Sequence, residues 1–549
     1  MQTTVTVNKQ LSAPGSLVTK WAWQGPADAI AFEEEAIRAS LLSFSETLYV
    51  VRSGDEIGVT CAGELGSRQA GAAAQVEVLS ILPPLPVENL GDPSFNTCYG
   101  TRYTYYGGAM ASAIASVPMV VAMGKAGLLG SFGAAGLPPA RLETAIQQVQ
   151  AELPDGPFAF NLIHSPSEEA LERRAVELYL RYGIRVVEAS AFLDLTPHIV
   201  HYRAAGLSQS TDGQVEIKNR VIAKISRREV AAKFMQPAPA NILAQLVQEG
   251  KISEEQASLA ERVPMADDVT VEADSGGHTD NRPLVCLMPA MLALRDEIQE
   301  KYQYDQPVRV GAAGGISTPA SALAAYAMGA SFICTGTINQ ACIESGVCDH
   351  TRSLLAKASM ADVMMAPSAD MFEMGVKVQV LKTGTMFAMR ASKLYELYSK
   401  YDSVEQIPPE EREKLEKQVF KRGLDEVWAD TVKFFTERDP EQITRANNNP
   451  KRKMALIFRW YLGLSSRWSA NGEKGRELDY QVWCGPSIGP FNDWTRGTYL
   501  AEPQNRSVVD VALHILTGSA YLARVNSLRN TGVQPSARLS AYYPRSPLV

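Results

Sequence analysis

Short apolar runs alternate with longer amphipathic segments from Tyr103 to Thr335. The apolar runs have the length of strands, and the intervening segments, such as Ala140–Leu153, carry apolar residues at helical spacing. Eight strands are predicted in this way, at Tyr103–Met110, Ala126–Phe132, Phe158–Ile163, Val186–Ala191, Val221–Ile225, Val269–Ala273, Val308–Ala312 and Phe332–Thr335. Strands that alternate with helices pair in parallel, so the pattern predicts an α/β fold built on a (β/α)8 TIM barrel.

The segment before the barrel has a different pattern. It predicts a helix over Ala29–Ile37 and strands over Thr47–Arg52 and Ile57–Cys61. The proline cluster Leu82–Pro86 then indicates a stiff boundary. We therefore expect a small N-terminal α+β domain at residues 1–95, followed by the barrel at 96–350.

The alternation also stops after the barrel. Val404–Phe435 is charged and helical in pattern, and five of the seven tryptophans fall between Trp428 and Trp494. Ser465–Trp468 and Trp483–Pro486 have the composition of aromatic loops. The sequence thus predicts a helical, aromatic-rich cap at residues 351–549.

The last two barrel strands end in glycines. The seventh runs into Gly314 and Gly315, and the eighth runs into Gly336 and Thr337. In a (β/α)8 barrel the loops after these strands gather backbone N–H groups and a helix N-terminus around a phosphate. Glycine lets the backbone come close to the anion because it carries no side chain. The pattern predicts a phosphorylated cofactor or substrate.

A histidine follows the sixth strand, in the sequence Asp274-Ser275-Gly276-Gly277-His278-Thr279. Because it comes just after two glycines at the carboxyl end of a barrel strand, we expect it to point into the cleft. Its pKa lies near physiological pH, which suits proton transfer. The alternative is a loop histidine bonded to backbone, and the glycines favour the catalytic interpretation.

Three other positions are candidates for ligand contacts. Asn161 could hydrogen-bond the edge of a heterocycle, or it could simply form a turn before Pro166. Lys224 interrupts an apolar strand, which suggests an anion or an electron-rich ring nearby unless it lies at a solvated strand end. Gly107-Gly108-Ala109-Met110 would let a flat ring lie on backbone, although a tight strand-end turn explains it equally.

Composition excludes several classes of protein. The net charge of −7 gives no reason to expect nucleic acid or an anionic membrane as a partner. Residues 1–16 have no apolar core of signal-peptide type, and the longest apolar run, Met110–Met123, is too short to span a membrane. Seven cysteines without a CxxC pair indicate reduced thiols. We expect a soluble, cytoplasmic protein.

Familiar cofactor and metal motifs are absent from the sequence. No GxGxxG follows a strand, and there is neither a Walker loop nor an HExxH motif. The five histidines other than His278 show no metal-ligand spacing, and His198 and His201 are expected on a helix. We predict no metal site.

Taken together, these motifs resemble the FMN-dependent barrel family that includes nitronate monooxygenases and FabK-type enoyl reductases. The chain is more closely similar to the PfaD family, which supplies trans-acting enoyl reductases to polyunsaturated fatty acid and polyketide synthases. The segments that carry this resemblance are Gly107–Met110, Gly127–Gly130, Asn161, Asp274–Asp280, Ala313–Ile316, Gly336-Thr337, Asn339–Ala341, Ala366–Glu373 and Gln379–Lys382. Asp274-Ser275 replaces the Glu-Ala common in the wider family, a PfaD-like feature that argues against nitronate chemistry.

The resemblance implies a function and a set of site residues. It implies reduction of 2-enoyl thioesters on acyl carrier protein domains, with FMN as cofactor and NADPH or NADH as reductant, and it allows a homodimer. His278 would be the catalytic acid. The implied cofactor-binding residues are Gly314, Gly315, Gly336 and Thr337 for the phosphate and Gly108, Ala109, Met110, Asn161, Lys224, Gly276 and Gly277 around the ring.

Three alternatives remain open at this point. The protein could be a nitronate monooxygenase-type flavin oxidase acting on a small molecule with O2. It could be a flavin-free barrel in which Gly314 and Gly315 bind a sugar or nucleotide phosphate. It could also be a non-catalytic assembly factor of a synthase, for which His278 would be dispensable.

Overall fold

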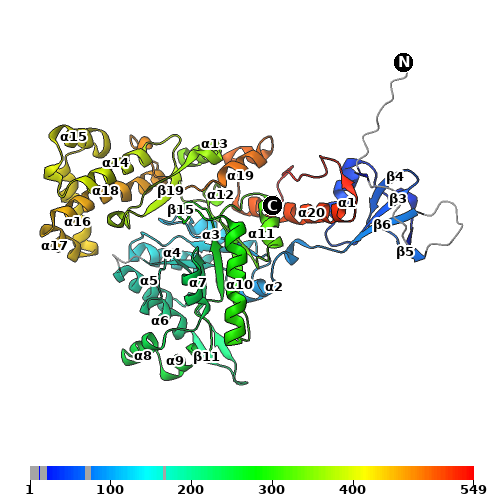
Figure 1. The fold of residues 1–549 in the computed structure, drawn as a ribbon, viewed down its shortest axis with the longest axis horizontal. Coiled ribbons are helices and arrows are strands. Elements are labelled where there is room, and N and C mark those ends of the chain that lie inside the picture. The colour runs from blue at the N-terminus through cyan, green and yellow to red at the C-terminus, as the bar shows by residue number, and fades with distance from the viewer. Residues whose placement is uncertain (1–10, 13–20, 68–75, 165–168) are drawn as a thin grey trace, which may run out of the picture.

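The computed structural model describes residues 11–12, 21–67, 76–164 and 169–549, and a closed barrel of eight parallel strands lies at its centre (Figure 1). The neighbouring strands pair in chain order around the barrel. The strands are β7 (Tyr105–Gly107), β8 (Leu129–Phe132), β9 (Ala159–Ile163), β10 (Val186–Ser190), β13 (Arg220–Ile225), β14 (Asp268–Glu272), β16 (Arg309–Ala313) and β17 (Ile333–Thr335). The predicted TIM barrel is confirmed, and each strand lies within or beside its predicted range.

Helices cover the outside of the barrel (Figure 1). The helices that connect the strands are α3 (Val117–Lys125), α4 (Pro139–Glu152), α5 (Glu169–Arg181), α6 (Pro197–Ala205), α7 (Arg228–Met235), α8 (Ala240–Gln248), α9 (Glu254–Ala260), α10 (Leu284–Tyr302) and α11 (Pro319–Ala327), with the hairpin β11 (Leu207–Gln209) and β12 (Val215–Ile217) below. His198 and His201 lie on α6, as expected. Many of these helices begin at a proline or a side-chain cap, such as Thr318 before α11.

The amino end of the barrel is closed by α2 (Pro93–Tyr99). Phe95 and Tyr99 of this helix pack in one buried cluster with interior barrel residues such as Phe332. The Tyr99 hydroxyl donates to Asp268, which also accepts two hydrogen bonds from Arg309 at 2.7 and 2.8 Å. The carboxylate and guanidinium therefore enter the interior as a bidentate pair, which offsets their loss of hydration.

The N-terminal region forms a five-stranded antiparallel sheet that lies apart from the barrel, at the far end of the molecule (Figure 1). Its order is β4 (Glu56–Thr60), β3 (Leu48–Ser53), β6 (Val76–Leu82), β2 (Trp21–Gln24) and β5 (Glu64–Ser67). The helix predicted over Ala29–Ile37 is present but begins five residues later, because α1 spans Glu34–Leu42. Ala31 instead forms an extended bridge to Val59, and the acidic residues Glu34 and Glu35 suit a helix N-terminus.

The long helix α20 (Val508–Asn530) connects this sheet to the barrel (Figure 1). Arg524 donates to the backbone carbonyls of residues 40, 41, 43, 44 and 46, so it caps the carboxyl end of α1. Among the described residues α20 is the one helix with the length and hydropathy of a membrane span, and 78% of that window is buried in the protein. Its apolar surface is therefore used in packing.

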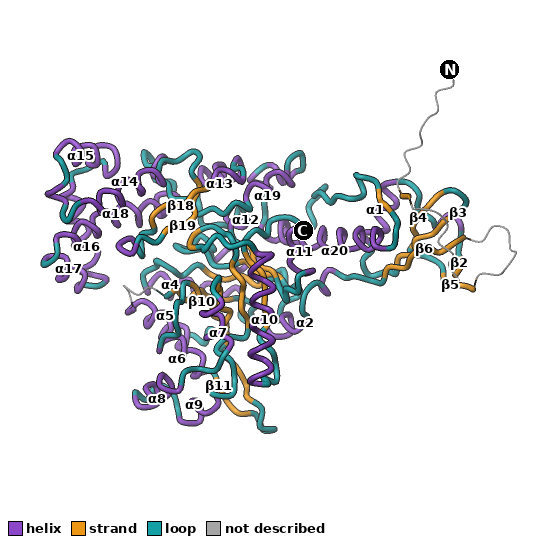
Figure 2. Tube along the Cα trace, viewed as in Figure 1, coloured by secondary structure: helices purple, strands orange, loops and turns teal. Residues whose placement is uncertain are grey.

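A layer of helices lies above the barrel mouth, and a strand pair separates the two (Figure 2). The strands β18 (Val363–Pro367) and β19 (Lys377–Leu381) extend β15 (Gly277–His278) into a three-stranded sheet. The helices are α12 (Thr337–Gln340), α13 (Asp349–Lys357), α14 (Phe387–Lys400), α15 (Pro409–Lys414), α16 (Leu424–Arg438), α17 (Pro440–Asn447), α18 (Pro450–Asn471) and α19 (Ile488–Thr495), with a π-helical turn at Leu415–Phe420.

The expected helical character of the C-terminal part is confirmed, but one detail of the prediction was wrong. Ser465–Trp468, expected in a loop, lies inside α18. Both serines are buried there, and Ser465 Oγ donates to the carbonyl of Tyr461 one turn earlier, so its hydroxyl is satisfied within the helix. All seven cysteines are free thiols.

Candidate active site

The predicted site residues come together at the carboxyl end of the barrel. Contacts connect them in sequence around the mouth, from the loop after β7 through β9, β10 and β13 to the loops after β14, β16 and β17. Parallel strands present their carboxyl ends on one face, so the placement follows from the fold. The residues placed there are Gly108, Ala109, Met110, Asn161, Lys224, Gly276, Gly277, His278, Gly314, Gly315, Gly336 and Thr337.

Glycines after β16 and β17 form an open backbone cradle. Gly314 has a φ of +80°, and a Cβ there would lie 2.6 Å from the carbonyl carbon of Ala273. At Gly315 and Gly336 a Cβ would meet nothing within 4 Å. Among the described residues no hydrogen bond is formed by the N–H groups of Gly315 and Gly336. These donors and the space beside them fit a phosphate.

A segment from near the end of the chain completes one side of this cradle. The Gly485 N–H donates to Thr337 Oγ1 at 3.1 Å, which leaves the threonine hydroxyl hydrogen available to a ligand. The backbones of Gly485 and Gly276 are in contact, and a Cβ on Gly276 would lie 2.9 Å from the Gly485 nitrogen. Gly485 belongs to the segment that the sequence predicted only as an aromatic loop, so its role was missed.

Lys224 lies in a carboxylate pair within the mouth. Its Nζ is 3.4 Å from Glu188 Oε1 and 3.2 Å from Glu272 Oε1. Burial alone would lower the pKa of Lys224, but the two glutamates outweigh it and hold the pKa above its usual value. The lysine is therefore charged at neutral pH, and the protein's own carboxylates account for its burial.

Glu188 connects this group to the first barrel loop. Its side chain is fully buried, and Oε2 accepts a 2.8 Å hydrogen bond from the Ala109 N–H. Glu188 and Glu272 were not singled out from the sequence. Like Lys224, each of them is a charged residue inside an apolar strand, and this sequence pattern identifies all three.

Asn161 is buried and largely committed to the protein. Its Nδ2 donates to the Glu188 carbonyl at 3.0 Å and to Ser190 Oγ at 2.8 Å. Its backbone carbonyl accepts from the Tyr179 hydroxyl at 2.6 Å. The side-chain carbonyl oxygen is thus the atom that Asn161 can offer to a ligand, as an acceptor.

The loop that follows β7 is held in a strained conformation. Ser112 and Ala113 both have a φ of +61°, a region that costs a residue with a side chain about 1–3 kcal/mol. Their N–H groups donate to the carbonyls of Ala135 and Gly133 at 2.8 and 2.9 Å. A Cβ on Gly133 would lie 1.7 Å from the Met110 carbonyl oxygen, so glycine is needed for this approach. The surroundings therefore fix the wall formed by Ala109 and Met110.

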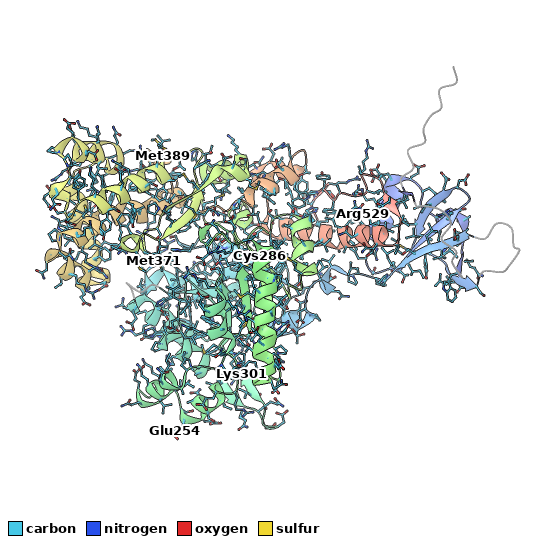
Figure 3. The ribbon with its side chains drawn as sticks, in the orientation of Figure 1. Glu254, Cys286, Lys301, Met371, Met389 and Arg529 are labelled. Carbon is cyan, nitrogen blue, oxygen red and sulfur yellow. The ribbon has the colours of Figure 1, made fainter. Side chains whose placement is uncertain are left out.

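His278 is paired with a residue far away in the sequence. Its Nε2 is 3.0 Å from Asp370 Oδ2, and the two side chains are 34% and 33% exposed. Burial alone would lower the pKa of His278, but the hydrogen bond and charge of Asp370 outweigh it, so that pKa is raised. Burial alone would raise the pKa of Asp370, and His278 lowers it. Met371, next to Asp370, lies between the barrel and the upper helices (Figure 3).

The loop that carries His278 is held by β19. Gln379 Nε2 donates to Asp274 Oδ1 and to the Ser275 carbonyl, both at 2.7 Å. Asp274 Oδ1 also accepts from Asn281 Nδ2 at 2.9 Å. Asp274, which departs from the pattern of the wider family, therefore fixes the loop geometry. The site as a whole combines an open backbone cradle, a charged polar wall and a histidine held against a carboxylate.

Three family models match this chain. Nitronate monooxygenase matches residues 103–393, which include the whole barrel. The fatty acid synthase subunit PfaD N-terminal domain matches residues 23–84, the N-terminal sheet. The inserted helical domain of [acyl-carrier-protein] S-malonyltransferase matches residues 401–480, from the cap helices.

Similar proteins come from synthase systems. A polyunsaturated fatty acid synthase protein of Thraustochytrium sp. is 50% identical over 513 residues, which are 92% of this chain and 34% of that protein. Polyketide biosynthesis protein PksE of Bacillus subtilis is 45% identical over 439 residues, 80% of this chain and 57% of that protein. The chain thus spans a third to somewhat over half of the length of these curated relatives.

A solved structure matches over its whole length. The enoyl reductase domain of MlnA from the macrolactin biosynthesis cluster of Bacillus amyloliquefaciens is 39% identical, with a TM-score of 0.77. The match covers 81% of this chain and 100% of that domain. The match extends beyond the barrel, because the barrel makes up a smaller share of the chain than the 81% that is matched.

Proposed function

Since this chain belongs to the PfaD family, within the nitronate monooxygenase family, we propose that it reduces 2-enoyl thioesters carried on acyl carrier protein for a polyketide or polyunsaturated fatty acid synthase. FMN would be the resident cofactor and NADPH or NADH the reductant. The observation that carries this proposal is the match over the whole of the MlnA enoyl reductase domain. The cap helices add support, because they match a domain of an enzyme that acts on acyl carrier protein.

The residues present fit FMN. Gly314, Gly315, Gly336 and Thr337 would hold the phosphate through backbone N–H groups and the threonine hydroxyl. The backbone of Gly108 to Met110, the Asn161 carbonyl oxygen, the Lys224 ammonium and the backbone at Gly276 and Gly277 would surround the ring. Glycine is needed at Gly108, because a Cβ there would lie 2.8 Å from Cys334 Sγ and 4.0 Å from Lys224 Nζ. Bound FMN would supply the hydride that reduces the β carbon of the substrate.

His278 would supply the proton that the reaction requires. Its Nε2 lies 3.0 Å from the Asp370 carboxylate, which can only accept, so the proton on Nε2 is used in that hydrogen bond. Nδ1 is then the nitrogen whose proton can pass to the α carbon of the thioester. General acid catalysis by a positioned side chain contributes about 10²–10⁴-fold to the rate. Asp370 favours the acid form by stabilising the imidazolium.

The alternative is a nitronate monooxygenase-type flavin oxidase, which the family match over 103–393 favours. The two functions differ in what reoxidises the reduced protein. An enoyl reductase is reoxidised by an enoyl thioester without oxygen, whereas a nitronate oxidase takes electrons from a nitronate and is reoxidised by O2. Asp274-Ser275 in place of Glu-Ala supports the first of these.

The test is an absorbance spectrum of the purified 549-residue chain under anaerobic conditions. We expect flavin absorbance bands at about 370 and 450 nm. They should bleach on addition of NADPH and return with crotonyl thioester. Absence of the bands, even after added FMN, would instead favour the flavin-free barrel. If the synthase product were unaffected by His278→Ala and by loss of FMN, the assembly-factor alternative would hold.

A further inference from the structure

A groove of about 590 Å³ opens beside the barrel mouth, between the barrel and the cap. We call it the side groove. Its floor is formed by the loop after β7 and the start of α3, its first wall by α4 and its second wall by the last turn of α18. None of its lining residues belongs to the cofactor-binding set described above, so the groove is distinct from the proposed flavin site.

The side groove begins at a loop that it shares with the candidate active site. Ser112 lies two residues after Met110, and its N–H donates to the carbonyl of Ala135 at 2.8 Å. A Cβ on Gly136 would lie 3.5 Å from Ser112 Oγ. Because Ala135 and Gly136 come just before α4, the first turn of that helix is the end of the groove nearest the mouth. The groove therefore runs outward along α4.

The first wall gives the groove its direction and length. Arg141, Thr144 and Gln148 lie on α4 at positions i, i+3 and i+7, which share one face of a helix. At 1.5 Å per residue they extend over about 10 Å, from Arg141 near the mouth to Gln148 at the outer end. A ligand that starts at the reaction centre would pass these positions in that order.

The surface of the groove near the mouth is apolar. Ala113, Val117 and Pro118 line its floor with part of their side chains exposed, and Leu137 and Ala145 line the inner part of its wall. No carboxylate is among the lining residues in the part of the chain that the structure describes. Hydrocarbon binds to such a surface because contact removes apolar area of both partners from water.

Two hydroxyl groups that line the groove are already satisfied by the backbone. Ser116 Oγ donates to the Glu344 carbonyl and accepts from the Met119 N–H. Thr144 Oγ1 donates to the Ala140 carbonyl at 3.0 Å. Neither hydroxyl has a proton left for a ligand, so the groove favours an apolar occupant.

We propose that the side groove holds the acyl chain of the 2-enoyl thioester, which runs from Ser112 past Thr144 toward Gln148. This rests on the proposed function, which makes the substrate an acyl thioester. Arg141 is exposed at the rim, where its methylene stem can lie along the chain while its guanidinium stays in water. The polar residues Gln148 and Asn471 mark the outer end, where the chain meets solvent.

The experiment measures kcat/KM of the 549-residue chain with crotonyl-, 2-octenoyl- and 2-decenoyl-pantetheine. Each methylene that the groove buries should raise kcat/KM about fourfold. Gln148→Trp and Thr144→Trp place an indole in the groove, so the ratio of kcat/KM for decenoyl over crotonyl thioester should fall at least about tenfold. Thr144→Trp should act on shorter chains than Gln148→Trp, because it lies about 6 Å nearer the mouth.

Gln147→Trp is the matched control. Gln147 is the neighbouring glutamine of the same helix, it is exposed, and its Nε2 donates to the hydroxyl of Tyr182, just after α5. It does not line the groove, so this variant should keep the native ratio. A ratio that falls equally in Gln147→Trp and Gln148→Trp would overturn the proposal, because the effect would then not come from the groove.

A binding measurement separates the groove from the proposed reaction. In calorimetric titration with butanoyl- and decanoyl-pantetheine, neither of which can be reduced, the longer chain should bind more tightly, and Gln148→Trp should remove that difference. Such binding without enoyl reduction would support the groove and refute the proposed function. Enoyl reduction with a decenoyl-to-crotonyl ratio that is unchanged in both groove variants would overturn the groove and leave the proposed function standing. So would an increase in the KM for NADPH with an unchanged ratio, which would assign the groove to the nucleotide.

Discussion

Asp370→Asn removes the charge that faces His278 while keeping the size of the side chain. At the observed 3.0 Å, Coulomb's law gives about 1.4 kcal/mol at a water-like dielectric constant and about 5.5 kcal/mol at an effective value of 20. A third of each side chain is exposed, so solvent screening favours the lower figure. An energy of about 1.4 kcal/mol corresponds to a tenfold change in the population of protonated His278.

The direction of the pH effect follows from the raised pKa of His278. In the native protein the acid form persists to a higher pH than an ordinary histidine allows. Asp370→Asn should lower that pKa, so the alkaline limb of kcat/KM for crotonyl thioester should move to lower pH. Above both pKa values the variant should be about tenfold slower, and at low pH the two proteins should converge because His278 is protonated in each.

The measurement is a pH series of kcat/KM with fixed ionic strength. Asp305→Asn, an exposed position, is the control, and its profile should match that of the native protein. A uniform loss of rate at every pH, with the alkaline limb unmoved, would mean that Asp370 acts only on structure. A His278→Ala variant that retains the alkaline limb would refute His278 as the acid.

Three further predictions concern the site. Lys224→Met leaves its two carboxylate partners without a countercharge, so it should lower the free energy of unfolding, measured by urea titration, by about 3–5 kcal/mol. Lys224→Arg keeps the charge and should restore most of that stability. In Gly336→Ala the added Cβ would have no protein atom within 4 Å, so the melting temperature should not change. The methyl group would occupy the space proposed for the phosphate, so the affinity for FMN, measured by flavin fluorescence, should fall at least about tenfold. Gly485→Ala places a Cβ 2.8 Å from the Gly276 nitrogen and should cost about 1–3 kcal/mol, and unchanged stability would contradict that contact.

The barrel and its mouth could be predicted from sequence because the relevant signals are local. A buried parallel strand is a short apolar run, and a backbone that must approach a ligand needs glycine where the strand ends. Gly314, Gly315 and Gly336 show both signals within a few residues. The start of the helix predicted over Ala29–Ile37 was misplaced, because the extended pairing of Ala31 with Val59 is decided by tertiary contacts.

The partners of the site residues could not be predicted in the same way. Asp370 is 92 residues from His278, and Gln379 is 105 residues from Asp274. The number of residues between two such partners follows no helix or strand period, because it depends on the length of chain that runs through the cap between them. Glu188 does show a local signal, a charged residue inside an apolar strand. Whether such a residue faces the barrel interior or the surrounding helices, however, depends on the barrel register.

The barrel alone leaves the candidate site incomplete, because the cap supplies contacts to two of its sides. β19 supplies Gln379, which fixes the loop of His278, and Asp370 precedes that strand and orients the imidazole. Gly485 then joins the same cap to Thr337 in the phosphate cradle. A displacement of the cap would therefore change the surroundings of both His278 and the glycine cradle, which makes the cap part of the candidate site rather than an appendage to it.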